Sequence, residues 1–145
     1  MYADVRLQHI GIVQLKQIRL SMNTPETFDF KFYEWEEKFR DKPFLKQPFG
    51  DEWEIYTWGE VGQYARKLAT GLRSLGLREN AHIGLISKNC REWIIADLAI
   101  VMAGYISVPF FPNLTSGEIN KLLTFGDVDL LFAGKVEDWE EQKAG

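Results

Sequence analysis

Few residues of this sequence combine the types and the spacing that catalysis requires. Cys90 is the only cysteine, and a position near a helix N-terminus would lower its pKa, but neither His9 nor His82 has an evident role as its base. A small structural cysteine is the favoured interpretation, and one cysteine with two histidines fits no metal-ligand spacing. Asp127 and Asp129 lie two residues apart at the start of an apolar run, which suits a turn better than a pair of acid–base carboxylates.

The chain also lacks a glycine-rich phosphate loop. Neither G-x-G nor G-x-x-x-x-G-K-[ST] occurs in the sequence. Lys88 is placed to meet an anion at the start of a predicted helix, but Asn89 acting as a helix cap explains that loop without a ligand. The sequon formed by Asn113 and Thr115 is explained more simply by Thr115 as a helix cap. The residues themselves therefore predict no catalytic residue, no cofactor-binding residue and no metal ligand.

Composition narrows the classes of protein. The chain has 145 residues, 46% of them hydrophobic and 26% charged, which is enough for one globular domain with a core. The formal net charge is −4 and no basic run occurs, which argues against nucleic acid as the partner. The longest apolar run, residues 93–105, is interrupted by Asp97 and is shorter than a membrane span requires. With one cysteine the chain cannot form an intramolecular disulfide, which fits a reducing compartment. We therefore expect a cytoplasmic location.

The elements that would position a site begin with an amphipathic helix. Phe28, Phe32, Trp35 and Phe39 recur at helical spacing, with the charged residues between them, among them Glu36, on the opposite face. We expect this stripe to pack in the core. Two short extended runs, residues 44–47 and 53–57, flank a turn at residues 50–51 and predict a small hairpin.

A regular α/β alternation follows from residue 57 to residue 134. Three helices are predicted over residues 58–75, 91–103 and 116–125, each opened by a capping residue that a glutamate follows three positions later: Thr57, Asn89 and Thr115. Three apolar runs of strand length, residues 82–87, 105–111 and 128–133, alternate with them and predict parallel strands buried on both faces. Pro109 cannot donate to a strand ladder, so the second strand should end there or lie at an edge. The predicted fold is a partial three-layer α/β sheet with flanking helices, a helix followed by βαβαβ.

Two segments lie outside this α/β unit, one at each end of the given sequence. Residues 1–21 carry Arg6, Lys16 and Arg19 and few acidic residues, a composition that slightly resembles a transit peptide. The favoured interpretation is that these residues are a non-native extension and that the native chain starts at Met22. The predicted division is therefore an N-terminal extension, residues 1–21, and an incomplete large domain, residues 22–145. The polar tail, residues 135–145, is expected to fray.

The order of several blocks resembles the opening of the adenylate-forming, or AMP-binding, enzymes. The blocks are YTWGEV (residues 56–61), LATGL (68–72), NCREW (89–93), LAI (98–100) and VPFFPNLT (108–115). Within that family the N-x-x-E-W form and residues 134–139 are most similar to bacterial long-chain fatty-acyl-CoA synthetases. One departure is the turn at residues 79–82, where the family has Gly-Asp-basic and this chain has Asn80, a residue that tolerates the left-handed conformation.

The resemblance implies a parent enzyme that activates a fatty acid with ATP and Mg²⁺ to an acyl-adenylate and then transfers the acyl group to coenzyme A. It implies that this chain is an N-terminal scaffold whose partner is the remainder of its own large domain, with no nucleic acid, and it leaves peripheral membrane contact open. The family's phosphate loop, ribose-binding aspartate and catalytic lysine match no residue here, so we expect the fragment alone to be inactive. Two alternatives remain: a stand-alone α/β ligand-binding module and a protein-interaction module that uses the aromatic helix.

Overall fold

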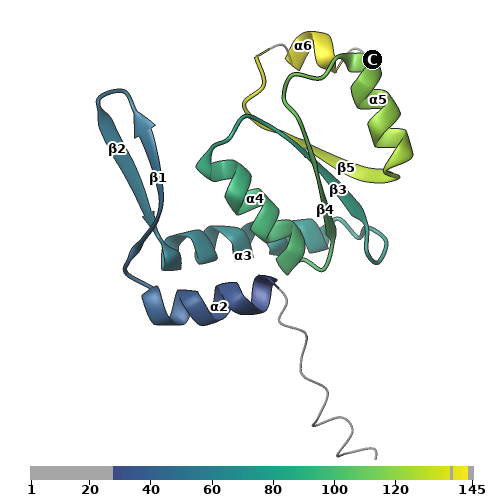
Figure 1. Ribbon diagram of the computed structural model, residues 1–145. Helices are drawn as coiled ribbons and strands as arrows, with labels where there is room; N and C mark the ends of the chain where they lie inside the picture. The colour runs from purple at the N-terminus through teal and green to yellow at the C-terminus, as the bar shows by residue number, and fades with distance from the viewer. Residues whose placement is uncertain (1–27, 138, 144–145) are drawn as a thin grey trace, which may run out of the picture.

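The computed structural model describes residues 28–137 and 139–143 (Figure 1). A helix followed by βαβαβ confirms the predicted α/β class, whereas the extension at residues 1–21 lies outside the described residues. In chain order the elements are α2 (Phe28–Phe39), β1 (Pro43–Phe49), β2 (Glu52–Thr57), α3 (Trp58–Ser74), β3 (His82–Ile86), α4 (Arg91–Met102), β4 (Ile106–Phe110), α5 (Ser116–Phe125), β5 (Val128–Ala133) and α6 (Trp139–Gln142).

The main sheet has three parallel strands in the order β4-β3-β5, so β3 lies in the centre. Pro109 belongs to β4 and pairs with Leu85 of β3, and β4 forms one edge of this sheet, as the missing N–H of proline predicted. All three strands run the same way, and their carboxyl ends therefore lie along one edge of the molecule. This edge is where ligands bind in open α/β sheets.

The two faces of the sheet are covered by different helices. Figure 1 shows α3 and α4 on one side of the sheet and α5 on the other. On the α3–α4 side, Leu72, Ile83 and Ile100 are fully buried and pack together. On the opposite side, Gly84 of β3 leaves room for neighbouring side chains: an added Cβ would lie 2.8 Å from Leu131 and 2.9 Å from Phe110. A glycine is therefore needed at the centre of the sheet.

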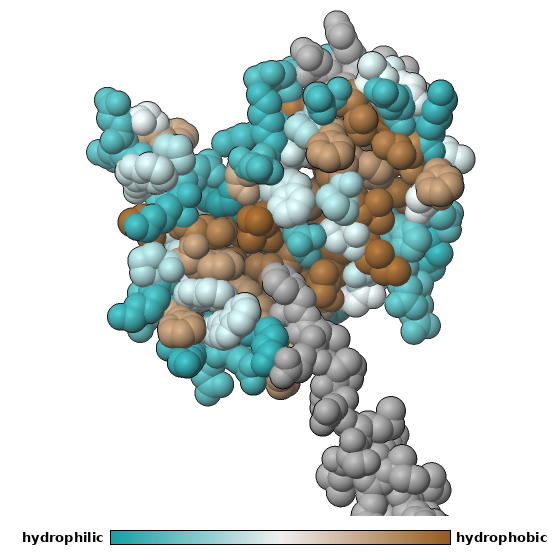
Figure 2. All heavy atoms as spheres, viewed as in Figure 1, coloured by the Kyte–Doolittle hydropathy of each residue, from teal (hydrophilic) through white to brown (hydrophobic). Residues whose placement is uncertain are grey.

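The α5 side of the sheet is less completely covered. Figure 2 shows apolar residues gathered between β4 and α5. Ile106, Leu122 and Phe125 are all exposed, Phe125 by 90%. Of the apolar residues Ile119, Leu122 and Leu123 of α5, only Ile119 is fully buried. The single helix α5 is too short to cover both edge strands.

The aromatic residues of α2 pack against the start of α3 and the hairpin. Phe32 is fully buried, and its ring lies 5.6 Å from the ring of Trp58, which in turn stacks on Phe44 at 3.9 Å. Core packing is thus the role of the centre of the predicted stripe. Trp35 remains partly exposed, and Tyr64 of α3 is also exposed.

Glu36 contradicts the prediction that the charged side of α2 faces solvent. Its side chain is buried and forms two hydrogen bonds with the guanidinium of Arg66 on α3, at 2.6 and 2.7 Å. Gly62 makes this pair possible, because an added Cβ would lie 2.3 Å from a carboxylate oxygen of Glu36. The prediction failed because Glu36, assigned to the face opposite the stripe, directly follows Trp35 and lies beside the stripe, where Arg66 of α3, 30 residues away, reaches it.

The predicted helix ends are mostly confirmed. Thr57 and Thr115 form capping boxes with glutamates three residues later, and these hydrogen bonds lower the pKa of both glutamates. Gly76 and Asn80 both have positive φ, 66° and 54°, so Asn80 does adopt the left-handed conformation that the family's glycine would supply. The tail, expected to fray, instead contains the short helix α6.

Candidate functional site at the carboxyl edge of the sheet

Ser87 joins the end of β3 to the end of β5. Its hydroxyl donates to the carbonyl of Lys88 at 2.9 Å and accepts from the N–H of Lys135 at 2.9 Å. The backbone N–H of Lys88 donates to the carbonyl of Lys135, and that of Gly134 donates to Ile86. An added Cβ at Gly134 would lie 2.6 Å from the Ser87 hydroxyl oxygen. The two loops are therefore fixed to each other, and no periodic pattern in the sequence indicated this role of Ser87.

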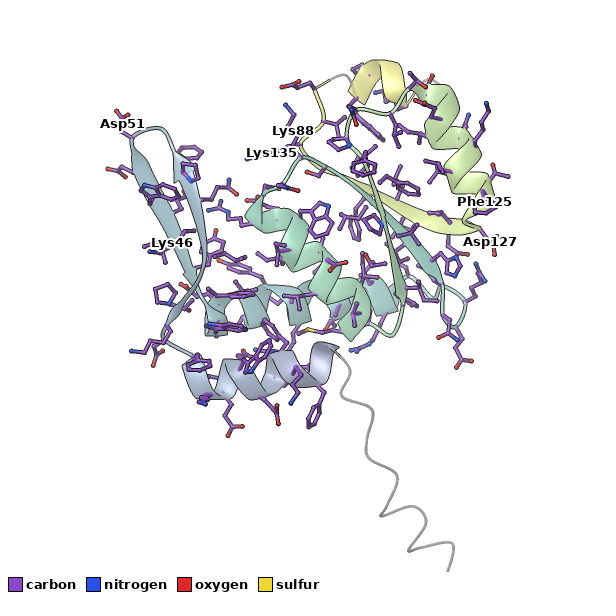
Figure 3. All side chains as sticks on the ribbon, viewed as in Figure 1. Lys46, Asp51, Lys88, Phe125, Asp127 and Lys135 are labelled. Carbon is purple, nitrogen blue, oxygen red and sulfur yellow. The ribbon has the colours of Figure 1, made fainter. Side chains whose placement is uncertain are left out.

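Lys88 meets an anion of its own chain. Its ammonium group forms an ion pair with Glu137, beyond β5, and this lowers the pKa of that carboxyl. Figure 3 shows Lys88 and Lys135 at the same end of the sheet. A ligand anion at the helix N-terminus would therefore have to compete with the Glu137 carboxylate for Lys88.

The helix α4 is capped differently from the prediction. Cys90, not Asn89, is the N-cap residue, and its side chain makes no capping hydrogen bond. Asn89 is exposed one position further out. The side chain of Gln47, in β1, accepts from the N–H of Arg91 at 2.9 Å instead. A tertiary contact from the hairpin therefore replaces the local cap. Such a contact is not visible in the residues that adjoin the helix in sequence.

No histidine lies beside the Cys90 thiol among the described residues, and the nearby carboxylate is that of Glu92, which accepts a hydrogen bond from the thiol. Its sulfur lies 3.7 Å from the Ser87 hydroxyl oxygen, and it is half-buried. His82 is at the opposite end of β3, and His9 lies outside the described residues. The structure thus favours the structural interpretation of Cys90 over a nucleophile paired with histidine.

Arg91 holds the hairpin against the start of α4. Its guanidinium lies 4.5 Å from the centre of the Tyr56 ring and forms an ion pair with Glu54 of β2. It also donates to Glu92 at 2.6 Å. Burial raises the pKa of the Glu92 carboxyl, but the hydrogen bonds from Arg91 and the helix N-terminus outweigh it and the pKa is lowered. Burial likewise raises the pKa of Tyr56.

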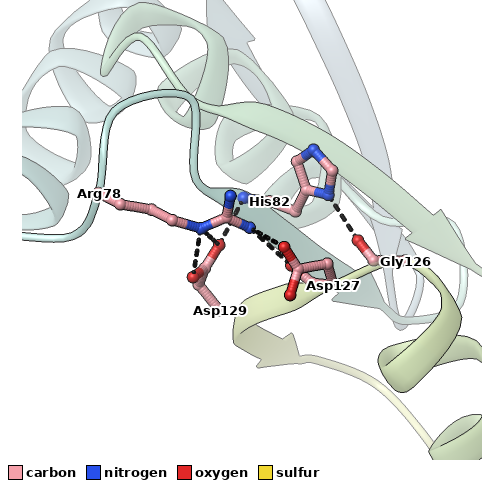
Figure 4. A network of polar contacts seen from close by, with 5 residues as sticks. All are labelled: Arg78, His82, Gly126, Asp127 and Asp129. Carbon is pink, nitrogen blue, oxygen red and sulfur yellow. Dashed lines mark hydrogen bonds and ion pairs between the residues drawn. The ribbon is translucent and has the colours of Figure 1, made fainter.

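Asp127 and Asp129 lie at the other end of the strands, where Figure 4 shows them around Arg78. Arg78 donates to Asp129 at 2.9 and 3.1 Å and to the Asp127 carboxylate at 2.6 Å. Asp129 also accepts from the N–H of His82 at 2.9 Å, and the His82 ring contacts the carbonyl of Gly126. The carboxylates fix a turn, as the sequence predicted for them, and the cluster is remote from the carboxyl edge.

A pocket opens between α3, α4 and the ends of β3 and β5. It has a volume of about 310 Å³, and its lining is almost entirely apolar. Leu85, Phe132 and Ala133 come from the strands, and Leu68, Trp93 and Ala96 come from the helices. Polar groups of Ser87, Cys90, Glu92, Gly134 and Lys135 complete the lining.

Across the described ranges, no three histidine, cysteine, aspartate or glutamate side chains gather as metal ligands would. Within the same residues no helix has both the length and the apolar character needed to cross a membrane. Asn113 is exposed, and Thr115 has the capping role that was predicted for it.

The sequence profile described as AMP-binding enzyme matches residues 32–144. Among curated proteins, the chain is 32% identical over 107 residues to 4-coumarate–CoA ligase 1 of Solanum tuberosum, covering 70% of this chain. It is 29% identical over 107 residues to the long-chain-fatty-acid–CoA ligase heimdall of Drosophila melanogaster, covering 71% of this chain. The chain spans 19% and 16% of the lengths of these two relatives.

Solved structures share the fold. The crystal structure of IdnL1 superposes with a TM-score of 0.69 over 77% of this chain and 23% of its own, at 21% identity. A fatty acid AMP ligase from Legionella pneumophila gives a TM-score of 0.67 over 74% of this chain and 19% of its own, at 17% identity. At these identities the likeness concerns the arrangement of helices and strands.

Proposed function

The chain belongs to the AMP-binding enzymes, and on that premise we propose that it is the N-terminal scaffold of an acid–thiol ligase. The observation that carries the proposal is the match over residues 32–144, in which the sequence blocks follow one another on one continuous α/β unit. The division into an extension, residues 1–21, and part of a large domain, residues 22–145, is included in this proposal. The same holds for a cytoplasmic location, which the single cysteine supports.

The proposed reaction has two steps. A carboxylate oxygen of the acid attacks the α-phosphorus of ATP, so that an acyl-adenylate forms and pyrophosphate leaves. The sulfur of coenzyme A then attacks the acyl carbon, the thiol proton is lost to solvent or base, and AMP leaves. The described residues provide neither a glycine-rich phosphate loop nor a cluster of three metal ligands for Mg²⁺. We therefore assign neither step to a residue of this chain.

The proposed substrate is a long-chain fatty acid. Long-chain-fatty-acid–CoA ligases from Drosophila and from mammals are among the similar curated proteins, which supports this choice. An aryl acid is the competing substrate, because a 4-coumarate–CoA ligase is similar over the same length of chain. Residues outside the described ranges, or beyond this chain, would have to make the distinction.

The test compares the 145-residue chain with the product of any longer reading frame that contains it. ATP–pyrophosphate exchange should be absent with the 145-residue chain and present with the longer protein. Palmitate should support exchange and acyl-CoA formation better than 4-coumarate. Exchange by the 145-residue chain alone would contradict its role as a scaffold, and a preference for 4-coumarate would contradict the fatty-acid assignment.

A gene that ends after residue 145, together with saturable ligand binding by the chain itself, would instead favour the alternative of a stand-alone binding module. A defined complex that buries the exposed aromatic residues of α2 would favour an interaction module.

A further inference from the structure

The β1–β2 hairpin is packed against the body of the molecule only at its base. Phe44 and Leu45 pack against the core there, Phe44 by stacking on Trp58 at 3.9 Å. Beyond the base, residues 46–55 form the outer hairpin, which projects from the body with Asp51 at its free end (Figures 1 and 3). The side chains of residues 48–55 are all exposed. Burial of apolar surface therefore holds the base in place but not the outer hairpin.

One residue of α4 holds both strands of the outer hairpin. The backbone N–H of Arg91 donates to the Gln47 side chain of β1 at 2.9 Å, and the Arg91 guanidinium pairs with Glu54 of β2. Within the part of the chain that the structure describes, no other hydrogen bond or ion pair joins the outer hairpin to the rest of the molecule. The ring of Tyr56, at the base, lies 4.5 Å from the guanidinium and helps to keep it in position.

A cavity of about 450 Å³ separates the outer hairpin from the start of α4. It is lined from β1 by residues 45–48, and from α4 and the turn before it by residues 89–91, Trp93 and Ile94. Because this space is not filled by packed side chains, the outer hairpin can move away from α4 without first disrupting a core.

The strand pairing is irregular where such a movement would be centred. The register of β1 against β2 shifts between Pro43 and Leu45, at the base, and is regular from Leu45 to Phe49. A bulge or similar irregularity interrupts the ladder locally and bends the strand. The outer hairpin is thus a regular two-stranded segment joined to the body through an irregular one, an arrangement suited to a hinge.

We propose that the outer hairpin is a hinged strap that closes over the start of α4, with Arg91 as its latch. Opening of the strap breaks the contacts of Arg91 with Gln47 and Glu54 together, frees the first N–H of α4 and opens the cavity beside Asn89 and Cys90. That turn follows β3 at the carboxyl edge of the sheet, where ligands bind in open α/β sheets. The strap therefore controls access to one side of this edge, and it does so whether or not the chain belongs to a ligase.

Hydrogen exchange of the Arg91 amide, measured by NMR on the 145-residue chain, reports the latch directly, because this N–H is bonded to the strap. In the wild type this amide should exchange through local opening, faster than the amides of the buried strand β3. Its exchange should also respond little to low concentrations of urea, because opening of the strap exposes much less surface than global unfolding.

Glu54→Gln is the decisive variant, because Glu54 lies on the other strand and contacts the guanidinium of Arg91, not its amide. If the two contacts open together, loss of this partly exposed pair should speed exchange of the Arg91 amide about threefold. Glu52→Gln is the matched control: it makes the same charge change two residues away on β2, at an exposed position, and should leave the exchange rate unchanged.

The base of the hairpin provides a second control. The N–H groups of Trp58 and Gly59 donate there to the carbonyls of Lys42 and Arg40 at 3.1 and 2.9 Å, and their exchange should be the same in wild type and Glu54→Gln. Equal acceleration at these amides would show that the base itself opens, which would reject the strap. The strap is also rejected if Glu54→Gln leaves exchange of the Arg91 amide unchanged, or if in the wild type this amide exchanges only by global unfolding.

Discussion

The buried pair between Glu36 and Arg66 is expected to be the main polar contribution to docking of α2 on α3. The Glu36 side chain is only 7% exposed, whereas that of Arg66 is 40% exposed. Removing one partner of a fully buried pair costs about 3–5 kcal/mol, and exposed pairs contribute about 0–1 kcal/mol. In Glu36→Ala the remaining guanidinium can be hydrated on its exposed side, so we expect the free energy of unfolding to fall by about 2 kcal/mol.

Glu34→Ala is the matched control. Glu34 lies on the same helix and pairs with Lys31 at 3.1 Å, but its side chain is 49% exposed. Both substitutions replace the same residue type in the same helix, so the gain in helix propensity is the same. The control should change the free energy of unfolding by no more than about 0.5 kcal/mol.

Urea unfolding of the single variants, of Arg66→Ala and of the double variant Glu36→Ala with Arg66→Ala measures the coupling. The two residues should couple by about 1–2 kcal/mol, because contacting charged groups are not additive. Equal losses in Glu36→Ala and Glu34→Ala, or a coupling energy near zero, would show that burial of this pair does not hold α2 in place.

Three further predictions concern other parts of the unit. Gly84→Ala should lower the free energy of unfolding by about 1–3 kcal/mol, because the added methyl group overlaps the side chains of the neighbouring strands. Gly71→Ala, in open space on α3, should raise that free energy by about 0.5–1 kcal/mol. Urea unfolding compares the two variants. Thr115→Ala should cost about 1 kcal/mol through loss of the α5 cap, measured in the same way. The hydrogen bond from Arg78 lowers the pKa of Asp129, so the charged Asp129 stabilises the fold fully above the unfolded pKa of about 3.9 and loses this effect as the pH falls through the folded pKa. The free energies of unfolding of the wild type and of Asp129→Asn should therefore converge in acid. A difference that stays constant with pH would contradict this.

The alternation of helices and strands was predictable because its signals are local. The side chain of Thr57 or Thr115 bonds to a backbone group three residues away, so each capping box lies within a few consecutive residues. Pro109 indicated an edge strand because its missing N–H is a property of the residue itself. The order of the sequence blocks similarly indicated the family before any contact was known.

The predictions failed where one residue meets another far along the chain. Asn89 has the chemistry of a cap, but Gln47 provides the hydrogen bond from the hairpin. Glu36 was placed on the face of its helix opposite the aromatic stripe, and its partner Arg66 on another helix could not be foreseen from that helix alone. The pocket escaped prediction for the same reason, since its lining comes from α3, α4, β3 and β5, and no periodicity within one segment encodes a concave surface.

The strand order β4-β3-β5 has a consequence for synthesis of the chain. β3 leaves the ribosome before both of its neighbours, and the side that receives β5 remains unpaired until residues 128–133 have emerged. During that interval β3, which becomes the most buried of the described strands, carries open backbone donors and acceptors. Non-local parallel pairing is slow to form. The nascent chain therefore passes through a stage at which a chaperone that binds extended apolar segments would compete with β5 for β3.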